Sequence, residues 1–112
     1  IFSFFLDNNE ANFITLKKII SAIITEEKLL TNNLTNKVVC IKSADPGYDY
    51  LFSKNIGGLI TCYGGANSHM AIRCAEMGIP AVIGCGENNF ERYCKANHIE
   101  IDASNKQVKI LL

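Results

Sequence analysis

From residue 37 to residue 112, short apolar runs alternate with segments of helical spacing, and this alternation narrows the choice of fold more than any other feature. Each run has four to seven residues and is bounded by turn-forming residues, which favours strands over buried helices. The runs are KVVCI, GGLITCY, AVIG, HIEIDA and VKILL. Three segments of helical character, DPGYDYLFSK, SHMAIRCAEM and ENNFERYCKA, separate the first four runs. This repetition predicts an α/β domain with a parallel central sheet and a closing antiparallel hairpin.

The segment from Ser68 to Met77 has the clearest helix boundaries. Asn67 and Ser68 are both good N-cap residues, and Gly78 follows the last helical residue. On a helical wheel the core-facing side is formed by Met70, Ala71, Cys74 and Met77. The opposite, polar side carries His69, Arg73 and Glu76. The sequence therefore predicts a short amphipathic helix with a histidine in its first turn.

His69 lies beside the free N–H groups and the positive end of this helix. Gly64 and Gly65 precede it and let the backbone come close to a bound group. A neutral imidazole is a competent nucleophile near neutral pH, and a phosphoryl group on it would meet the usual donors for phosphate. A single histidine is more often an ordinary surface residue, and we interpret His98, which opens a strand without such surroundings, in that way.

The first thirty-six residues have a different pattern. NFITLKKIISAIITEEKLL places apolar residues at helical spacing, which predicts an amphipathic helix, and its lysines and glutamates exclude a membrane span. The polar segment TNNLTNK, residues 31–37, is the best candidate for a linker or hinge. We therefore expect a helical arm and linker over residues 1–36 and a domain over residues 37–112. Because the chain begins with Ile1, we expect it to be a piece of a longer polypeptide.

Composition narrows the classes of function. Hydrophobic residues make up 48% of the chain, and eleven basic residues balance eleven acidic ones, so a broad nucleic-acid surface is not expected. The IFSFFL segment at the N-terminus is too short to cross a bilayer. The five cysteines are Cys40, Cys62, Cys74, Cys85 and Cys94. Because none forms a C-x-x-C pair, we interpret them as small buried residues kept reduced in the cytoplasm rather than as a metal site.

The stretch GGANSHMAIRCAEMGIPAVIG, residues 64–84, resembles the phosphohistidine signature of the phosphoenolpyruvate-utilising enzymes. This family includes phosphoenolpyruvate synthase, pyruvate phosphate dikinase, enzyme I of the sugar phosphotransferase system and the rifampicin phosphotransferases. The glycine pair, Asn-Ser-His and Gly-Ile-Pro keep their spacing together, which makes the resemblance specific. The upstream segment DPGYDYLFSKNIGGLIT and the downstream segment IEIDASNKQVKIL are also similar to the family, so the likeness covers about residues 37–112.

The resemblance implies a swivelling β/β/α phosphohistidine domain, with His69 as the phosphorylated, catalytic residue. The phosphate-binding residues that we assign are Gly64, Gly65, Asn67, Ser68 and Arg73. In the family, the histidine accepts a phosphoryl group from ATP at an ATP-grasp domain, or from phosphoenolpyruvate, and passes it to pyruvate or another acceptor. Mg²⁺ and the donor bind at partner domains of the same polypeptide, so we expect no metal or cofactor on this domain. We also expect the isolated chain to be inactive alone.

Two positions of the helix differ from the family pattern. Met70 stands where a small residue is usual, and Ala75 stands where an arginine is often found. Arg73 instead lies four residues after His69, on the same helix face. We expect Arg73 to hold the phosphoryl group or to contact a partner domain, because its guanidinium offers paired donors to phosphate oxygens. The alternative is a solvated arginine paired loosely with Glu76.

Two other classes of protein remain open from the sequence. One is a degenerate module that kept the fold without catalysis, against which the intact His69 argues. The other is a stand-alone phosphocarrier protein, against which the predicted N-terminal helix argues. The sequence does not fix the acceptor, the donor or the oligomeric state, and it is compatible with a homodimer.

Overall fold

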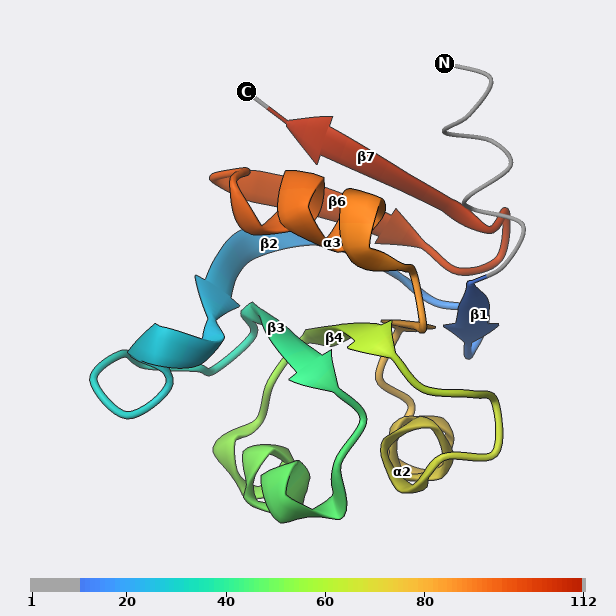
Figure 1. Ribbon diagram of the computed structural model, residues 1–112, viewed down its shortest axis with the longest axis horizontal. Helices are drawn as coiled ribbons and strands as arrows, with labels where there is room; N and C mark the ends of the chain where they lie inside the picture. Colours follow the sequence, from blue (N-terminus) through green and yellow to red (C-terminus); the bar gives the residue numbers. More distant parts are fainter. Residues whose placement is uncertain (1–10, 112) are drawn as a thin grey trace.

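The computed structural model describes residues 11–111, which form seven strands of one mixed sheet together with helices on both of its faces (Figure 1). The elements are β1 (Asn12–Ile14), β2 (Lys18–Thr25), η1 (Glu26–Lys28), β3 (Val38–Ser43), η2 (Pro46–Lys54), β4 (Gly58–Tyr63), α2 (His69–Met77), β5 (Ala81–Ile83), α3 (Glu87–Cys94), β6 (His98–Asp102) and β7 (Gln107–Leu111). The η elements are 3₁₀ helices. No helix among the described residues is long and apolar enough to cross a membrane.

The strands lie in the order β1-β5-β4-β3-β2-β6-β7. The four strands β2, β3, β4 and β5 are parallel to their neighbours within this group. β1 pairs antiparallel with β5 at one edge, and the β6–β7 hairpin continues the sheet antiparallel from β2 at the other. Parallel neighbours need a crossover connection. η2 supplies it between β3 and β4, and α2 supplies it between β4 and β5.

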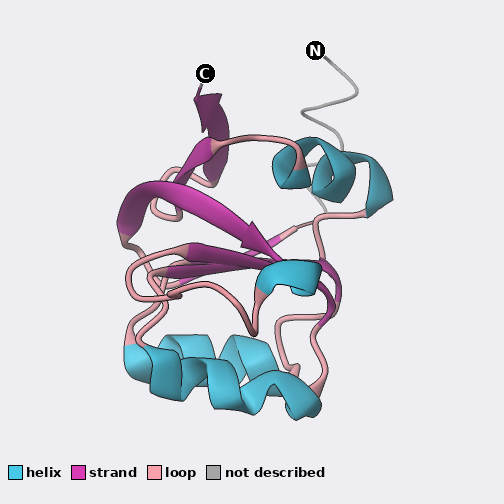
Figure 2. Ribbon diagram, turned by 90° about the vertical axis from the view of Figure 1, so that its left-hand side faces the viewer, coloured by secondary structure: helices cyan, strands magenta, loops and turns pink. Residues whose placement is uncertain are grey.

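The two faces of the sheet have separate hydrophobic cores. η2 and α2 cover one face and α3 lies over the other, as Figure 2 shows. β3 illustrates the division, because its successive side chains point to opposite faces. Val39 and Ile41 pack with Leu51, Phe52 and Met70 on the η2–α2 face, whereas Val38 and Cys40 pack with Tyr93 on the α3 face.

The helix predicted over residues 13–30 is wrong. These residues form β1, β2 and the short η1 helix, and β2 lies inside the sheet between β3 and β6. The segment is rich in isoleucine, and β-branched side chains favour strands. β2 carries apolar side chains at both odd and even positions, and such a run also fits helical spacing over a short window.

The expectation of a helical arm over residues 1–36 is therefore also wrong for residues 11–36, the part of this segment that the structure describes. The polar segment of residues 31–37 lies in the loop that leads from η1 to β3, with the side chain of Leu34 buried in the core of the η2–α2 face. Because this loop joins neighbouring strands of one sheet, it cannot act as a hinge between an arm and a separate domain. Residues 1–10 lie outside the described part of the chain.

Other local predictions are confirmed. The Asp45 carboxylate accepts a hydrogen bond of 2.8 Å from the backbone N–H of Gly47, which caps η2. Ser68 caps α2 by accepting a 3.3 Å hydrogen bond from the N–H of Ala71. Gly78 ends the helix in the left-handed conformation, with φ of 70°. The final two strands form the predicted antiparallel hairpin.

Candidate functional site

The loop between β4 and α2 begins at the carboxyl end of β4, where ligands commonly bind in parallel sheets. Gly64 has φ of 136°, and a Cβ on it would lie 2.7 Å from the Cβ of Ala44. Gly84 follows β5 with φ of 76°, and a Cβ there would lie 2.3 Å from the carbonyl oxygen of Gly64. Both positions therefore require glycine, and the close approach of their backbones fixes the direction in which the loop leaves the sheet.

Gly65 has different surroundings. A Cβ at this position would meet no described atom within 4 Å. The residue is exposed, and its carbonyl oxygen accepts a 3.0 Å hydrogen bond from the N–H of Ser68, which closes the turn before α2. Packing thus explains Gly64, whereas at Gly65 the missing side chain leaves open space beside the backbone. Asn67 is also exposed in this turn, and Ser68 is half-buried by its capping role.

His69 is the first residue of α2, and its side chain is 42% exposed. Its Nε2 atom lies 2.7 Å from Oδ1 of Asp49, which belongs to η2 on the same face of the sheet. The hydrogen bond from His69, followed by that from Arg73, lowers the pKa of Asp49. The imidazole is therefore accessible to another molecule while an ionised carboxylate holds one of its nitrogen atoms.

Arg73 lies one turn after His69 and contacts η2 as well. Its Nε donates a 3.0 Å hydrogen bond to the same Oδ1 atom of Asp49, and one of its terminal nitrogens donates a 3.3 Å bond to Glu76. Its guanidinium carbon lies 5.1 Å from the centre of the Phe52 ring, within the range of a cation–π contact. The loose pairing with Glu76 alone, which the sequence left open, is thus only part of the environment of Arg73.

The site consequently consists of the loop before α2, its first turn and one carboxylate from η2. Asp49 was missed by the sequence analysis, although a signal for it exists. Crossover connections between parallel strands are right-handed, so two successive crossovers that advance in the same direction lie on the same face. β3, β4 and β5 are adjacent in this order, which brings η2 beside α2. His98, in contrast, begins β6 and pairs with Ala22 and Leu111 in the sheet.

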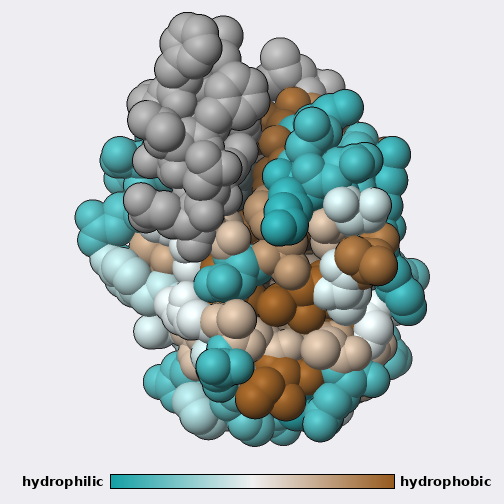
Figure 3. Space-filling model, turned by 90° about the vertical axis from the view of Figure 1, so that its right-hand side faces the viewer, coloured by the Kyte–Doolittle hydropathy of each residue, from teal (hydrophilic) through white to brown (hydrophobic). Residues whose placement is uncertain are grey.

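Among residues 11–111, no group of three or more histidine, cysteine, aspartate or glutamate side chains is arranged to hold a metal ion. The surface near the site carries apolar side chains instead. Ile72 and Met77 of α2 are 48% and 45% exposed. Figure 3 views the side on which β1 and α2 lie, and brown apolar patches appear there among hydrophilic surface. Such a surface suits contact with another protein domain.

Comparison with known proteins shows the family of the chain. The family model of the PEP-utilising enzyme, mobile domain, matches residues 34–106, and the chain belongs to this family. The matched range contains the whole loop before α2, His69 and Asp49. A phosphoenolpyruvate synthase from Synechocystis is 37% identical over 51 residues, which are 46% of this chain and 6% of that enzyme. The chain thus matches only a small part of that relative's length.

A solved structure supports the fold independently. The solution NMR structure of a UPF0107 protein superposes with a TM-score of 0.67, covering 91% of this chain and 97% of that one, at 9% sequence identity. At this level of identity the likeness concerns the fold alone.

Proposed function

We propose that this chain is the phosphoryl-carrier domain of a phosphotransferase similar to phosphoenolpyruvate synthase, with His69 as the residue that carries the phosphoryl group. The observation that supports this most is the position of His69 at the exposed start of α2, within the segment matched by the family model. The helix N-terminus and the open backbone at Gly65 favour a bound phosphoryl group at that place.

In the proposed step, an imidazole nitrogen of His69 attacks the phosphorus of the donor, and the donor's bridging oxygen leaves with the electron pair. Nε2 already shares a hydrogen bond with Asp49, so a phosphoryl group on Nε2 requires this carboxylate to move away. Two negative groups at one nitrogen would also repel each other. Arg73 shares the Oδ1 atom of Asp49 and is released by the same movement, which frees its Nε to donate to a phosphoryl oxygen.

ATP or phosphoenolpyruvate is the proposed donor, pyruvate the first acceptor to test, and both bind at other domains of the same polypeptide. Mg²⁺ belongs to those domains, where it would neutralise phosphate charge. The carrier then moves as one unit, because β2 and the β6–β7 hairpin belong to the same sheet as the site. The isolated chain is expected to turn over no substrate.

A chase experiment on the full-length protein tests the carrier role. The protein is labelled with ATP carrying radioactive phosphate at the β and γ positions, freed of nucleotide, and mixed with pyruvate. We expect an acid-labile, base-stable label on the protein that moves into phosphoenolpyruvate. His98→Ala serves as the matched control and keeps the label, while His69→Ala loses it. A label that survives in the His69→Ala protein would refute the assignment; a label that forms but resists pyruvate would refute only the acceptor.

A further inference from the structure

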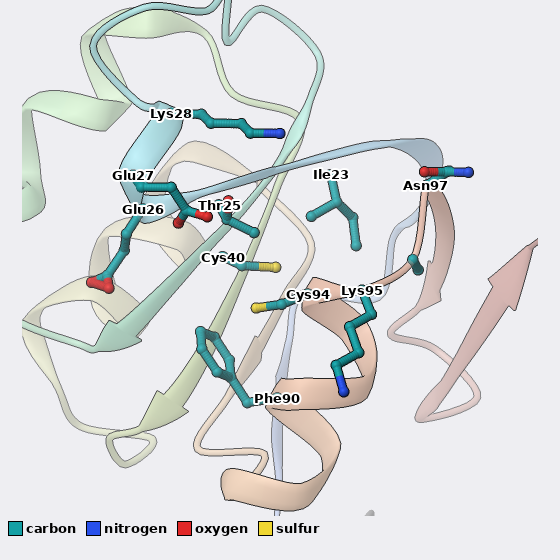
Figure 4. Close-up of a pocket in the computed structure, with 11 residues that line it drawn as sticks. Ile23, Thr25, Glu26, Glu27, Lys28, Cys40, Phe90, Cys94, Lys95 and Asn97 are labelled. Atoms are coloured by element: carbon teal, nitrogen blue, oxygen red, sulfur yellow. The ribbon is translucent and has the colours of Figure 1, made fainter.

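A pocket of about 410 Å³ opens on the face of the sheet opposite His69, between β2, the η1 helix and the end of α3. Its wall includes two cysteines from distant parts of the sequence, Cys40 of β3 and Cys94, the last residue of α3. Figure 4 shows their sulfur atoms pointing toward one another across the pocket wall. A second pocket, of about 390 Å³, shares Phe90 and Cys94 with the first as lining residues.

The two thiols differ in access. Cys40 is completely buried under the core of the α3 face, whereas Cys94 is half-buried and borders both pockets. A molecule of the size of a peroxide can therefore reach Cys94 first, and Cys40 belongs to the wall of the same pocket. Cys74, by contrast, is buried on the other face of the sheet, in the core formed with η2.

The pKa shifts of the two thiols also favour Cys94 as the first to react. The neighbouring thiol of Cys40 lowers the pKa of Cys94, against the opposing effects of burial and of the carboxylates of Glu27 and Glu26. The thiol of Cys94, together with burial, raises the pKa of Cys40 well above its ordinary value. Because the thiolate is the reactive form of cysteine, Cys94 is the better nucleophile of the pair.

We propose that Cys94 and Cys40 form a thiol pair that peroxides oxidise to an intramolecular disulfide between α3 and β3. In the first step the Cys94 thiolate attacks one peroxide oxygen, the O–O bond breaks, and hydroxide leaves, giving a sulfenic acid on Cys94. In the second step the Cys40 sulfur attacks the Cys94 sulfur. The S–S bond forms, the S–O bond breaks, and the released hydroxide takes the proton of Cys40 to give water. This proposal is independent of the phosphoryl-carrier function.

Such a disulfide would cross-link the chain around the entire segment from β3 to α3, which contains the candidate site. Cross-links that close long loops restrict the unfolded chain most. We therefore expect the oxidised protein to unfold at a temperature at least about 5 °C above that of the reduced protein.

The test is peptide mapping of the protein after treatment with hydrogen peroxide and alkylation of the remaining thiols. The expected product is a peptide linking Cys40 to Cys94, which dithiothreitol releases, together with the rise in unfolding temperature. Cys94→Ser should lose both the link and the rise. In Cys40→Ser, the sulfenic acid on Cys94 should persist and react with dimedone.

Cys74→Ser is the matched control and should keep the link, because this thiol lies on the other face. The wild-type peptide map decides the question even if a Cys40 variant does not fold. A map in which Cys94 stays reduced, or in which Cys94 is linked to Cys62 or Cys85 instead, would overturn the proposal. A Cys94→Ser protein that is still stabilised by peroxide would do the same.

Discussion

The two faces of the sheet carry different reactive groups, although helices cover both faces. On the face covered by η2 and α2, the polar groups Asp49, His69 and Arg73 lie at the surface, each between one third and one half exposed. On the face covered by α3, the thiols of Cys40 and Cys94 lie in and beneath a pocket. The first set joins α2 to η2, and the second joins α3 to β3.

The two faces differ in the size of the molecule that can reach their reactive groups. An imidazole at the exposed start of a helix can be approached by another protein domain, as a carrier function requires. A thiol that borders a pocket can be approached by a small oxidant but not by a folded domain. The comparison predicts that changes on one face leave the chemistry of the other intact, and the following predictions are arranged around that point.

The largest expected effect is a reciprocal loss of the two activities. His69→Ala should abolish phosphoryl transfer completely and leave peroxide oxidation of Cys94 unchanged, because the residues lie on opposite faces. Cys94→Ser should abolish the disulfide and leave phosphoryl transfer within about twofold of wild type, within the range of a distant substitution. Both quantities are measured on the same preparations, by acid-labile label and by peptide mapping. Loss of both activities in either variant would show that the faces are coupled.

The next effect separates Gly84, which follows β5, from Gly65 in the loop before α2. Gly84→Ala should destabilise the protein by at least about 2 kcal/mol, because φ is positive and the new Cβ would lie 2.3 Å from a backbone oxygen. Gly65→Ala should change stability by less than about 0.5 kcal/mol. It should nevertheless slow phosphoryl transfer, because the methyl group fills the open space beside the backbone. Urea unfolding and the transfer rate are the measurements, and a Gly65→Ala protein with wild-type transfer would remove Gly65 from the site.

Arg73 tests how the charged face supports the phosphoryl group. Arg73→Ala should slow transfer or shorten the lifetime of the phosphohistidine by roughly five- to thirtyfold. Arg73→Lys should recover only part of this loss, because an ammonium group lacks the paired donors and the planar contact with Phe52. Glu76→Ala is the control for the remaining contact. If the transfer rate and the phosphohistidine lifetime of Arg73→Ala both stay within twofold of wild type, Arg73 has only a structural role.

The smallest effect concerns pH. Because the folded protein lowers the pKa of Asp49 below its ordinary value of about 3.9, Asp49 stabilises the fold above that pH and loses this contribution as the pH falls through the folded pKa. Asp49→Asn should therefore unfold at a slightly lower temperature than wild type at pH 7, and the difference should shrink in acid once the pH falls below the folded pKa of Asp49. Thermal melts at the two pH values measure this. A difference of equal size at both would mean that the charge of Asp49 contributes nothing.

The segments that could be predicted from sequence are those whose limits are set by local chemistry. The caps of η2 and α2, the glycine end of α2 and the closing hairpin depend on residues within a few positions of each other. β2 could not be predicted, since its identity as a strand depends on pairing with β3 and β6, which are distant in sequence. The same reason explains why Asp49 was missed at the site. His69, by contrast, was marked by its own neighbours in the sequence.

The central claim is that His69 carries the phosphoryl group, and the most direct measurement is the position of the phosphate itself. The full-length protein is incubated with ATP and Mg²⁺, or with phosphoenolpyruvate, digested at alkaline pH and analysed by tandem mass spectrometry. The account predicts a single phosphate, on the peptide that contains the start of α2, bound to the imidazole of His69. Phosphate located on His98, on a serine or threonine, or on a peptide outside this segment would contradict it.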